Sequence, residues 1–106
     1  FLFVDDMAQA ALFVLELDED TYKSNTKPML SHINVGTGKD ITIKELAQTM
    51  KDVVGYKGKI SFDTSKPNGS PRKLIDVSRL SNMGWNYKVD LKEGLELTYS
   101  WYLDNA

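Results

Sequence analysis

The sequence predicts a small mixed α/β domain in which helices outnumber strands. A chain of 106 residues has room for one domain, so we expect a single domain over residues 1–106. Its 42% hydrophobic and 26% charged residues give the balance of a globular protein. Short β-branched or aromatic runs alternate with longer segments of helical periodicity, which favours the mixed class.

The opening residues predict a strand followed directly by a helix. Phe1–Val4 is an aromatic and β-branched run typical of a strand, and because the chain starts on it without Met, we expect a fragment of a larger protein. Asp5 and Asp6 favour a helix start, since acidic groups face the positive end of the helix dipole. A helix over about 5–17 is predicted by apolar residues at helical spacing: Val4, Met7, Ala8, Ala11, Leu12 and Leu15.

The middle of the chain predicts a loop, a strand and a capped helix. Residues 18–31 are polar and should form a loop, and 32–35 should form a short strand that turns at Gly36-Thr37-Gly38. Thr42 and Glu45 have the spacing of a capping box, in which each satisfies a free backbone N–H of the other. The predicted buried face of this helix, which Gly55 should end, comprises Ile43, Leu46, Ala47, Met50, Val53 and Val54.

The last part of the chain predicts one more strand and two helices. Residues 59–62 read as a strand, and 63–73 as a loop rich in Pro, Gly, Asn and Ser. A short helix is expected over about 77–83, closed by Gly84. Asp90 is a second candidate cap for a final helix that continues through Trp101 and Tyr102.

The composition excludes several classes of function. Without cysteine there are no disulfides, thiolate metal sites or cysteine nucleophiles, and a single histidine, His32, excludes a multi-histidine metal site. A net charge of −2 gives no overall field that would attract nucleic acid. The longest apolar run, Ala10–Leu15, is too short to span a membrane and no signal peptide is visible, so we expect a cytoplasmic protein.

The glycine and carboxylate motifs favour structural roles. Gly36 and Gly38 lack the third glycine of a dinucleotide-binding fingerprint, because Ile41 stands there. The phosphate-loop pattern fails as well, since Asp40 follows Gly38-Lys39. A glycine turn for close packing is the better interpretation. Structural roles are also preferred over acid/base or metal chemistry for three further groups: His32, the pair Asp5 and Asp6, and the stretch Asp18-Glu19-Asp20.

The segment Lys66–Lys73, which we call the basic loop, carries the best candidate site. It places three cations in eight residues: Lys66, Arg72 and Lys73. Arginine presents a fork that fits phosphate oxygens, and lysine a mobile point charge. Asn68 and Ser70 could form hydrogen bonds with a sugar or base. Two prolines stiffen the loop, which reduces the entropy lost on binding. The alternative is a solvated loop without a ligand.

Several segments resemble a known enzyme superfamily. Residues 1–8 and 28–38 resemble the C-terminal portion of extended short-chain dehydrogenase/reductases. The basic loop and its continuation to Leu80, the run Met83-Gly84-Trp85, and residues 91–102 are similar more specifically to the GDP-L-fucose synthase family. The resemblance covers essentially the whole chain. It implies the substrate-binding domain of such an enzyme, with the Rossmann half absent.

The resemblance also implies an activity. This family converts GDP-4-keto-6-deoxy-D-mannose to GDP-L-fucose by 3,5-epimerisation and NADPH-dependent 4-reduction. Its N-terminal Rossmann domain holds NADPH, the Ser-Tyr-Lys group and the epimerisation residues, and it forms the homodimer. None of the five tyrosines here has a lysine four residues later. We therefore expect no catalytic, cofactor-binding or metal-binding residue in this chain, and no turnover by it alone.

Carried over to this sequence, the resemblance implies three substrate-binding residues. Arg72 and Lys73 would lie near the diphosphate of the GDP-sugar. Asn68 stands where the family often has an aspartate that contacts the substrate; asparagine keeps a hydrogen-bond acceptor and loses the charge. Two alternatives are another nucleotide-sugar epimerase or dehydratase, and a free-standing, non-catalytic interaction domain. An exposed apolar face would argue against the second.

Overall fold

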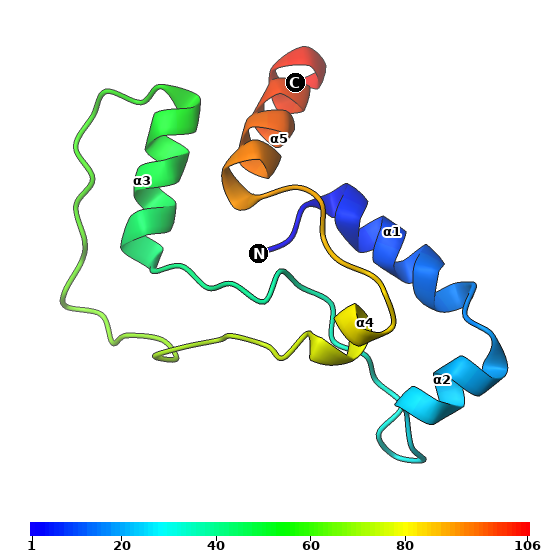
Figure 1. Cartoon of the computed structure of the whole chain (residues 1–106). Coiled ribbons are helices and arrows are strands. Elements are labelled where there is room, and N and C mark those ends of the chain that lie inside the picture. The colour runs from blue at the N-terminus through cyan, green and yellow to red at the C-terminus, as the bar shows by residue number, and fades with distance from the viewer.

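The computed structural model describes residues 1–106 as five helices joined by long extended segments (Figure 1). The helices are α1 (Val4–Leu15), α2 (Glu19–Asn25), α3 (Ile43–Val54), α4 (Ser78–Asn82) and α5 (Leu91–Asn105). None of them combines the length and apolarity needed to cross a bilayer. Helices α1, α3, α4 and α5 confirm the four helices predicted from sequence.

Helix α3 begins and ends on the predicted signals. The Glu45 N–H donates to Thr42 Oγ1 over 3.1 Å, and the Thr42 N–H donates to Glu45 Oε2 over 3.0 Å. Gly55 follows the helix with φ of 68°, a left-handed conformation that suits glycine. The predicted burial of the apolar face is only partial, since no residue of α3 is fully buried and Ile43 is 69% exposed. Four residues of that face are half-buried: Leu46, Ala47, Val53 and Val54. Helix α5 packs against this helix.

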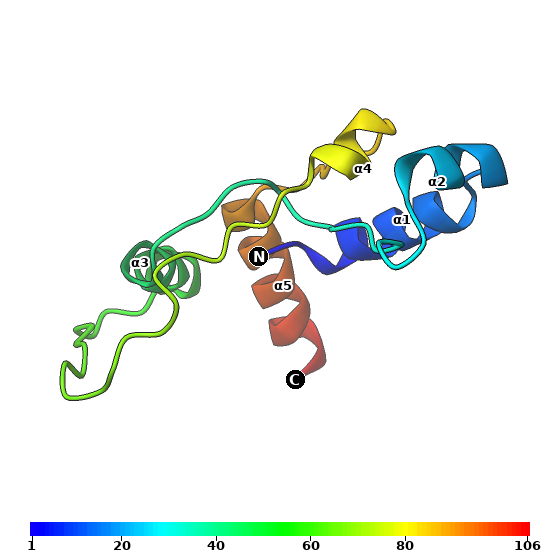
Figure 2. The ribbon, with the colours of Figure 1, turned by 90° about the horizontal axis from the view of Figure 1, so that it is seen from below.

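The three predicted strands do not form. Residues 1–3, 32–35 and 59–62 belong to no sheet, and the one isolated β-bridge joins Lys27 and Leu30. A strand needs a partner along its hydrogen-bonding edge, and these segments have none. The segment around Gly36 and Gly38 instead lies beside the segment before α4 (Figures 1 and 2), where the Ile75 and Val77 side chains approach the two glycines. The Asn34 side-chain amide donates to the Asp76 carbonyl over 3.0 Å.

Two local predictions also need correction. The expected loop over 18–31 contains α2, which begins because the Asp18 carboxylate accepts the Thr21 N–H over 2.8 Å. A carboxylate at the N-cap that accepts the N–H three residues later is a common way to cap a helix. Asp90 stands at the N-cap position of α5 but makes no capping hydrogen bond. Its carboxylate faces Lys39 and Tyr87 instead.

The molecule is flat and has a very small core. Its Cα radius of gyration is 17.4 Å, whereas a compact chain of this size has about 13 Å. Six of the 106 residues are buried, and the apolar core is Ala10 of α1, Leu80 of α4 and Trp85. Figure 2 shows α3 and the following loop far from α1 and α2. Much apolar surface therefore remains open to solvent.

Candidate functional site

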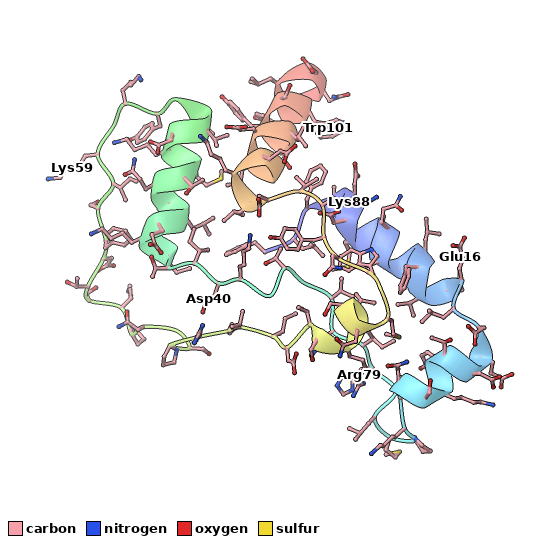
Figure 3. All side chains as sticks on the ribbon, viewed as in Figure 1. Glu16, Asp40, Lys59, Arg79, Lys88 and Trp101 are labelled. Carbon is pink, nitrogen blue, oxygen red and sulfur yellow. The ribbon has the colours of Figure 1, made fainter.

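The basic loop lies across from the segment that leads into α3. Figure 3 shows Asp40 on that segment, and the Arg72 guanidinium forms an ion pair with the Asp40 carboxylate. An open hollow of about 530 Å³ separates the two segments and is lined by Phe1, Lys39, Asp40, Ile41, Thr42, Ile43, Glu45, Ser70, Pro71, Arg72 and Lys73. The structure thus brings Arg72 and Lys73 to one hollow. Asn68 belongs to the same exposed loop but does not line the hollow.

The ion pair affects the titration of both partners. The hydrogen bond from Arg72 lowers the pKa of Asp40, and the same bond raises the pKa of Arg72. Both side chains are substantially exposed, at 67% for Arg72 and 41% for Asp40, so solvent screens their attraction. Lys73 makes no ion pair. An incoming anion would therefore find Lys73 free and Arg72 held by a weak, exchangeable partner.

A third cation, Lys39, borders the same hollow. Its Nζ lies 3.1 Å from Asp90 Oδ1 and 5.2 Å from the centroid of the Tyr87 ring. Tyr87 donates its hydroxyl hydrogen to the same Asp90 oxygen over 3.0 Å. Tyr87 and then Asp90 raise the pKa of Lys39, and Lys39 lowers that of Asp90. No local pattern in the sequence points to Lys39, because its partners lie about fifty residues later in the chain.

A buried carboxylate supports the segment that carries Tyr87 and Asp90. Asp6 is 3% exposed, and its oxygens accept the Lys88 N–H over 3.1 Å and the Val89 N–H over 2.9 Å. Asp5 and Asp6 do lie in the first turn of α1, as predicted. The structure corrects the role of Asp6, however, because its side chain binds the backbone ahead of α5 and not its own helix. No local signal distinguishes it from exposed Asp5.

The glycine turn after His32 fits its structural interpretation. Gly38 has φ of 70°, and a Cβ atom at Gly36 would come within 3.0 Å of the Ile75 side chain. Both positions therefore favour glycine, Gly38 for its backbone conformation and Gly36 for close packing. His32 is exposed, and its carbonyl accepts a hydrogen bond from the Arg79 guanidinium over 2.6 Å. Its imidazole plays no part in that contact.

The chain is similar in sequence to curated enzymes that are much longer. No protein-family model matches it. It is 59% identical to the C-terminal region of a GDP-L-fucose synthase from Escherichia coli K12, over 99% of this chain and 33% of that enzyme. It is 50% identical over its whole length to a putative GDP-L-fucose synthase from Arabidopsis thaliana, of which it covers 30%. The chain thus spans about a third of the length of the curated relatives it matches.

Solved structures show the same arrangement of elements. A GDP-6-OMe-4-keto-L-xylo-heptose reductase from C. jejuni superposes with a TM-score of 0.83 at 36% identity, over 96% of this chain and 30% of that one. A GDP-mannoheptose C4 reductase from Campylobacter jejuni with NADP bound gives 0.77 at 35%, over 93% and 29%. The fold is that of the C-terminal part of extended short-chain dehydrogenase/reductase GDP-sugar enzymes, which confirms the resemblance.

Proposed function

We propose that this chain is the GDP-sugar-binding part of a GDP-L-fucose synthase. In the proposed reaction, GDP-4-keto-6-deoxy-D-mannose is epimerised at carbons 3 and 5 and reduced at carbon 4 by NADPH. The observation that carries the proposal is the 59% identity to the E. coli enzyme over 99% of this chain. The proposal includes a cytoplasmic location.

The hollow beside the basic loop supports binding of a diphosphate. Lys73 offers a free ammonium group, and Arg72 can exchange the exposed Asp40 carboxylate for a phosphate oxygen. Lys39 adds a third positive charge, and the first residues of α3 add the positive end of a helix dipole. In this proposal Asn68, outside the hollow, accepts a hydrogen bond from a sugar or ribose hydroxyl.

The exposed apolar surface supports attachment to a further domain. An open hollow of about 410 Å³ lies between the N-terminal segment, α3 and α5, with apolar lining residues that include Phe1, Leu2, Phe3, Leu46, Met50, Val89, Leu91 and Leu95. A surface of this kind marks an interaction site. We propose that it packs against an N-terminal Rossmann domain that holds NADPH and the catalytic groups and that forms the homodimer. This exposed apolar surface argues against a free-standing domain.

A chimeric enzyme tests the proposal. Residues 1–106 replace the matching C-terminal region of the E. coli GDP-L-fucose synthase, and NADPH oxidation is followed with GDP-4-keto-6-deoxy-D-mannose. We expect turnover within about tenfold of the parent enzyme. A tenfold decrease corresponds to a loss of about 1.4 kcal/mol in transition-state stabilisation. A chimera that folds, binds NADPH and gives no turnover with this substrate would contradict the proposal. UDP-sugars would then be tested as substrates of the chimera, because the alternative assignment is another nucleotide-sugar enzyme of the superfamily.

A further inference from the structure

The dipeptide Asn68–Gly69 lies unprotected on the basic loop. Every residue from 61 to 76 is exposed, and the Gly69 N–H donates to no other protein group. A Cβ atom built at Gly69 would meet nothing within 4 Å. The side-chain amide of Asn68 likewise makes no hydrogen bond. Nothing in the fold therefore keeps the Gly69 nitrogen away from the amide carbon of Asn68.

We propose that Asn68 is a site of spontaneous deamidation. The Gly69 backbone nitrogen loses its proton to hydroxide and attacks Cγ of Asn68. The bond from Cγ to the side-chain nitrogen breaks, ammonia leaves, and a five-membered succinimide ring remains. Water then opens the ring at either carbonyl, which gives aspartate or isoaspartate. The net change consumes one water and releases one ammonia, without oxidation or reduction.

The other five asparagines lack this combination of features. Each is followed by a residue with a side chain, which shields the attacking nitrogen, whereas glycine leaves it open. Three of them also hold their side-chain amide in a hydrogen bond to a backbone carbonyl: Asn25 to Thr21, Asn34 to Asp76, and Asn105 to Trp101. The remaining two, Asn82 and Asn86, precede Met83 and Tyr87. Asn68 alone is both unrestrained and followed by glycine.

The product changes the charge of the candidate site. Aspartate or isoaspartate places a carboxylate four residues before Arg72, on a loop that otherwise carries three cations and no anion. Isoaspartate also adds a carbon to the main chain ahead of Ser70. The loop then attracts a diphosphate less strongly, because the new charge opposes it. This consequence, unlike the modification itself, rests on the proposed function.

Peptide mapping of the full 106-residue chain tests the modification. The chain is incubated at neutral and at mildly alkaline pH, conversion is followed by mass spectrometry, and isoaspartate is detected by enzymatic methylation. We expect Asn68 to convert while the other five asparagines stay intact, and to convert faster at the higher pH. The Gly69→Ala variant should slow the loss, and Asn86 serves as the internal control. Conversion at Asn68 no faster than at Asn86, or unchanged in Gly69→Ala, would overturn the proposal.

A second measurement separates this inference from the proposed function. Binding of inorganic pyrophosphate is followed through the amide NMR shifts of Arg72 and Lys73, before and after deamidation. We expect the Kd to rise roughly two- to fivefold, the usual effect of one exposed charge. An unchanged Kd would overturn the charge effect at the loop. Absence of saturable shifts in the unmodified chain would count against the diphosphate site, and the mass data would still decide the modification.

Discussion

Arg72 and Lys73 are neighbours in sequence but differ in their surroundings. Asp40 holds Arg72 in an exposed ion pair, while Lys73 has no acidic partner and lines the same hollow. Lys66 belongs to the same loop and is also exposed, but it does not line the hollow. These differences make Lys73 the residue whose loss should weaken substrate binding most, with Lys66 as its matched control.

The Lys73→Ala substitution in the chimeric enzyme should raise KM for the GDP-sugar about tenfold with little change in kcat. A charge-assisted hydrogen bond to a phosphate contributes about 1.5–3 kcal/mol, and the lower end of that range corresponds to this factor. Lys66→Ala should change KM less than about twofold. Steady-state kinetics measure both. Equal effects of the two variants would show that only the general charge of the loop matters.

Asp6 should be the most important polar residue for stability. Its buried carboxylate accepts the N–H groups of Lys88 and Val89, so Asp6→Ala leaves two donors without partners. We expect a loss of about 2–4 kcal/mol in the free energy of unfolding. Asp5→Ala, one residue earlier and exposed, should cost less than about 0.5 kcal/mol. Chemical denaturation of the chimeric enzyme compares them, and a similar loss for both would argue against the buried contact.

Among the elements, α3 offers a test of its cap. Thr42→Ala removes the hydroxyl that accepts the Glu45 N–H and donates to the Glu45 carboxylate, and should cost about 1 kcal/mol of stability. Thr49→Ala is the matched control, because the Thr49 hydroxyl only donates to the Glu45 carbonyl within the helix. Circular dichroism of the two variants during thermal unfolding measures the difference. Equal losses would mean that the cap contributes nothing beyond helix propensity.

The same cap predicts a pH dependence. The hydrogen bonds from Thr42 lower the pKa of Glu45. A lowered folded-state pKa stabilises the fold fully above the unfolded-state pKa of glutamate, and this stabilisation is lost as the pH falls through the folded-state value. Acidification should therefore reduce the stability of the unsubstituted chain more than that of the Glu45→Gln variant. Stability that falls in parallel for both would exclude this contribution of Glu45.

The elements also show which features a sequence can predict. Local signals located α3, since Thr42, Glu45 and Gly55 act within one helix. Strands depend on pairing with distant segments, so the β-branched runs gave no guide to whether a partner exists. The contacts of Asp6 with Lys88 and of Lys39 with Asp90 span 82 and 51 residues, and no local pattern encodes them. The basic loop was found because its charges are adjacent in sequence.

At the scale of the whole molecule, exposed apolar side chains outnumber buried ones. They include Val4 at 69%, Trp101 at 66% and Leu103 at 60% exposure, against an apolar core of three residues. Fully burying one such side chain contributes about 1.5–3 kcal/mol, so covering this surface would add considerably to the free energy of unfolding. The relatives carry a larger N-terminal region, and under the proposed function a domain of that kind would cover this surface.

The chain alone should therefore bind a fluorescent dye that recognises apolar surface, and the chimeric enzyme should bind much less per molecule. Dye fluorescence titrated at equal molar concentration measures the difference. The parent E. coli enzyme is the control for dye binding by the N-terminal part. Dye binding by the chain as low as that of the parent would mean that its apolar surface is already covered.

An amide NMR titration of the chimeric enzyme determines whether the basic loop of this chain binds the diphosphate of a GDP-sugar. Residues 1–106 carry the isotope label, and GDP is compared with UDP. We expect saturable shifts at Arg72 and Lys73, with GDP binding more tightly than UDP. Saturation by GDP with no shift anywhere in residues 66–73 would contradict it, because the nucleotide would then bind elsewhere.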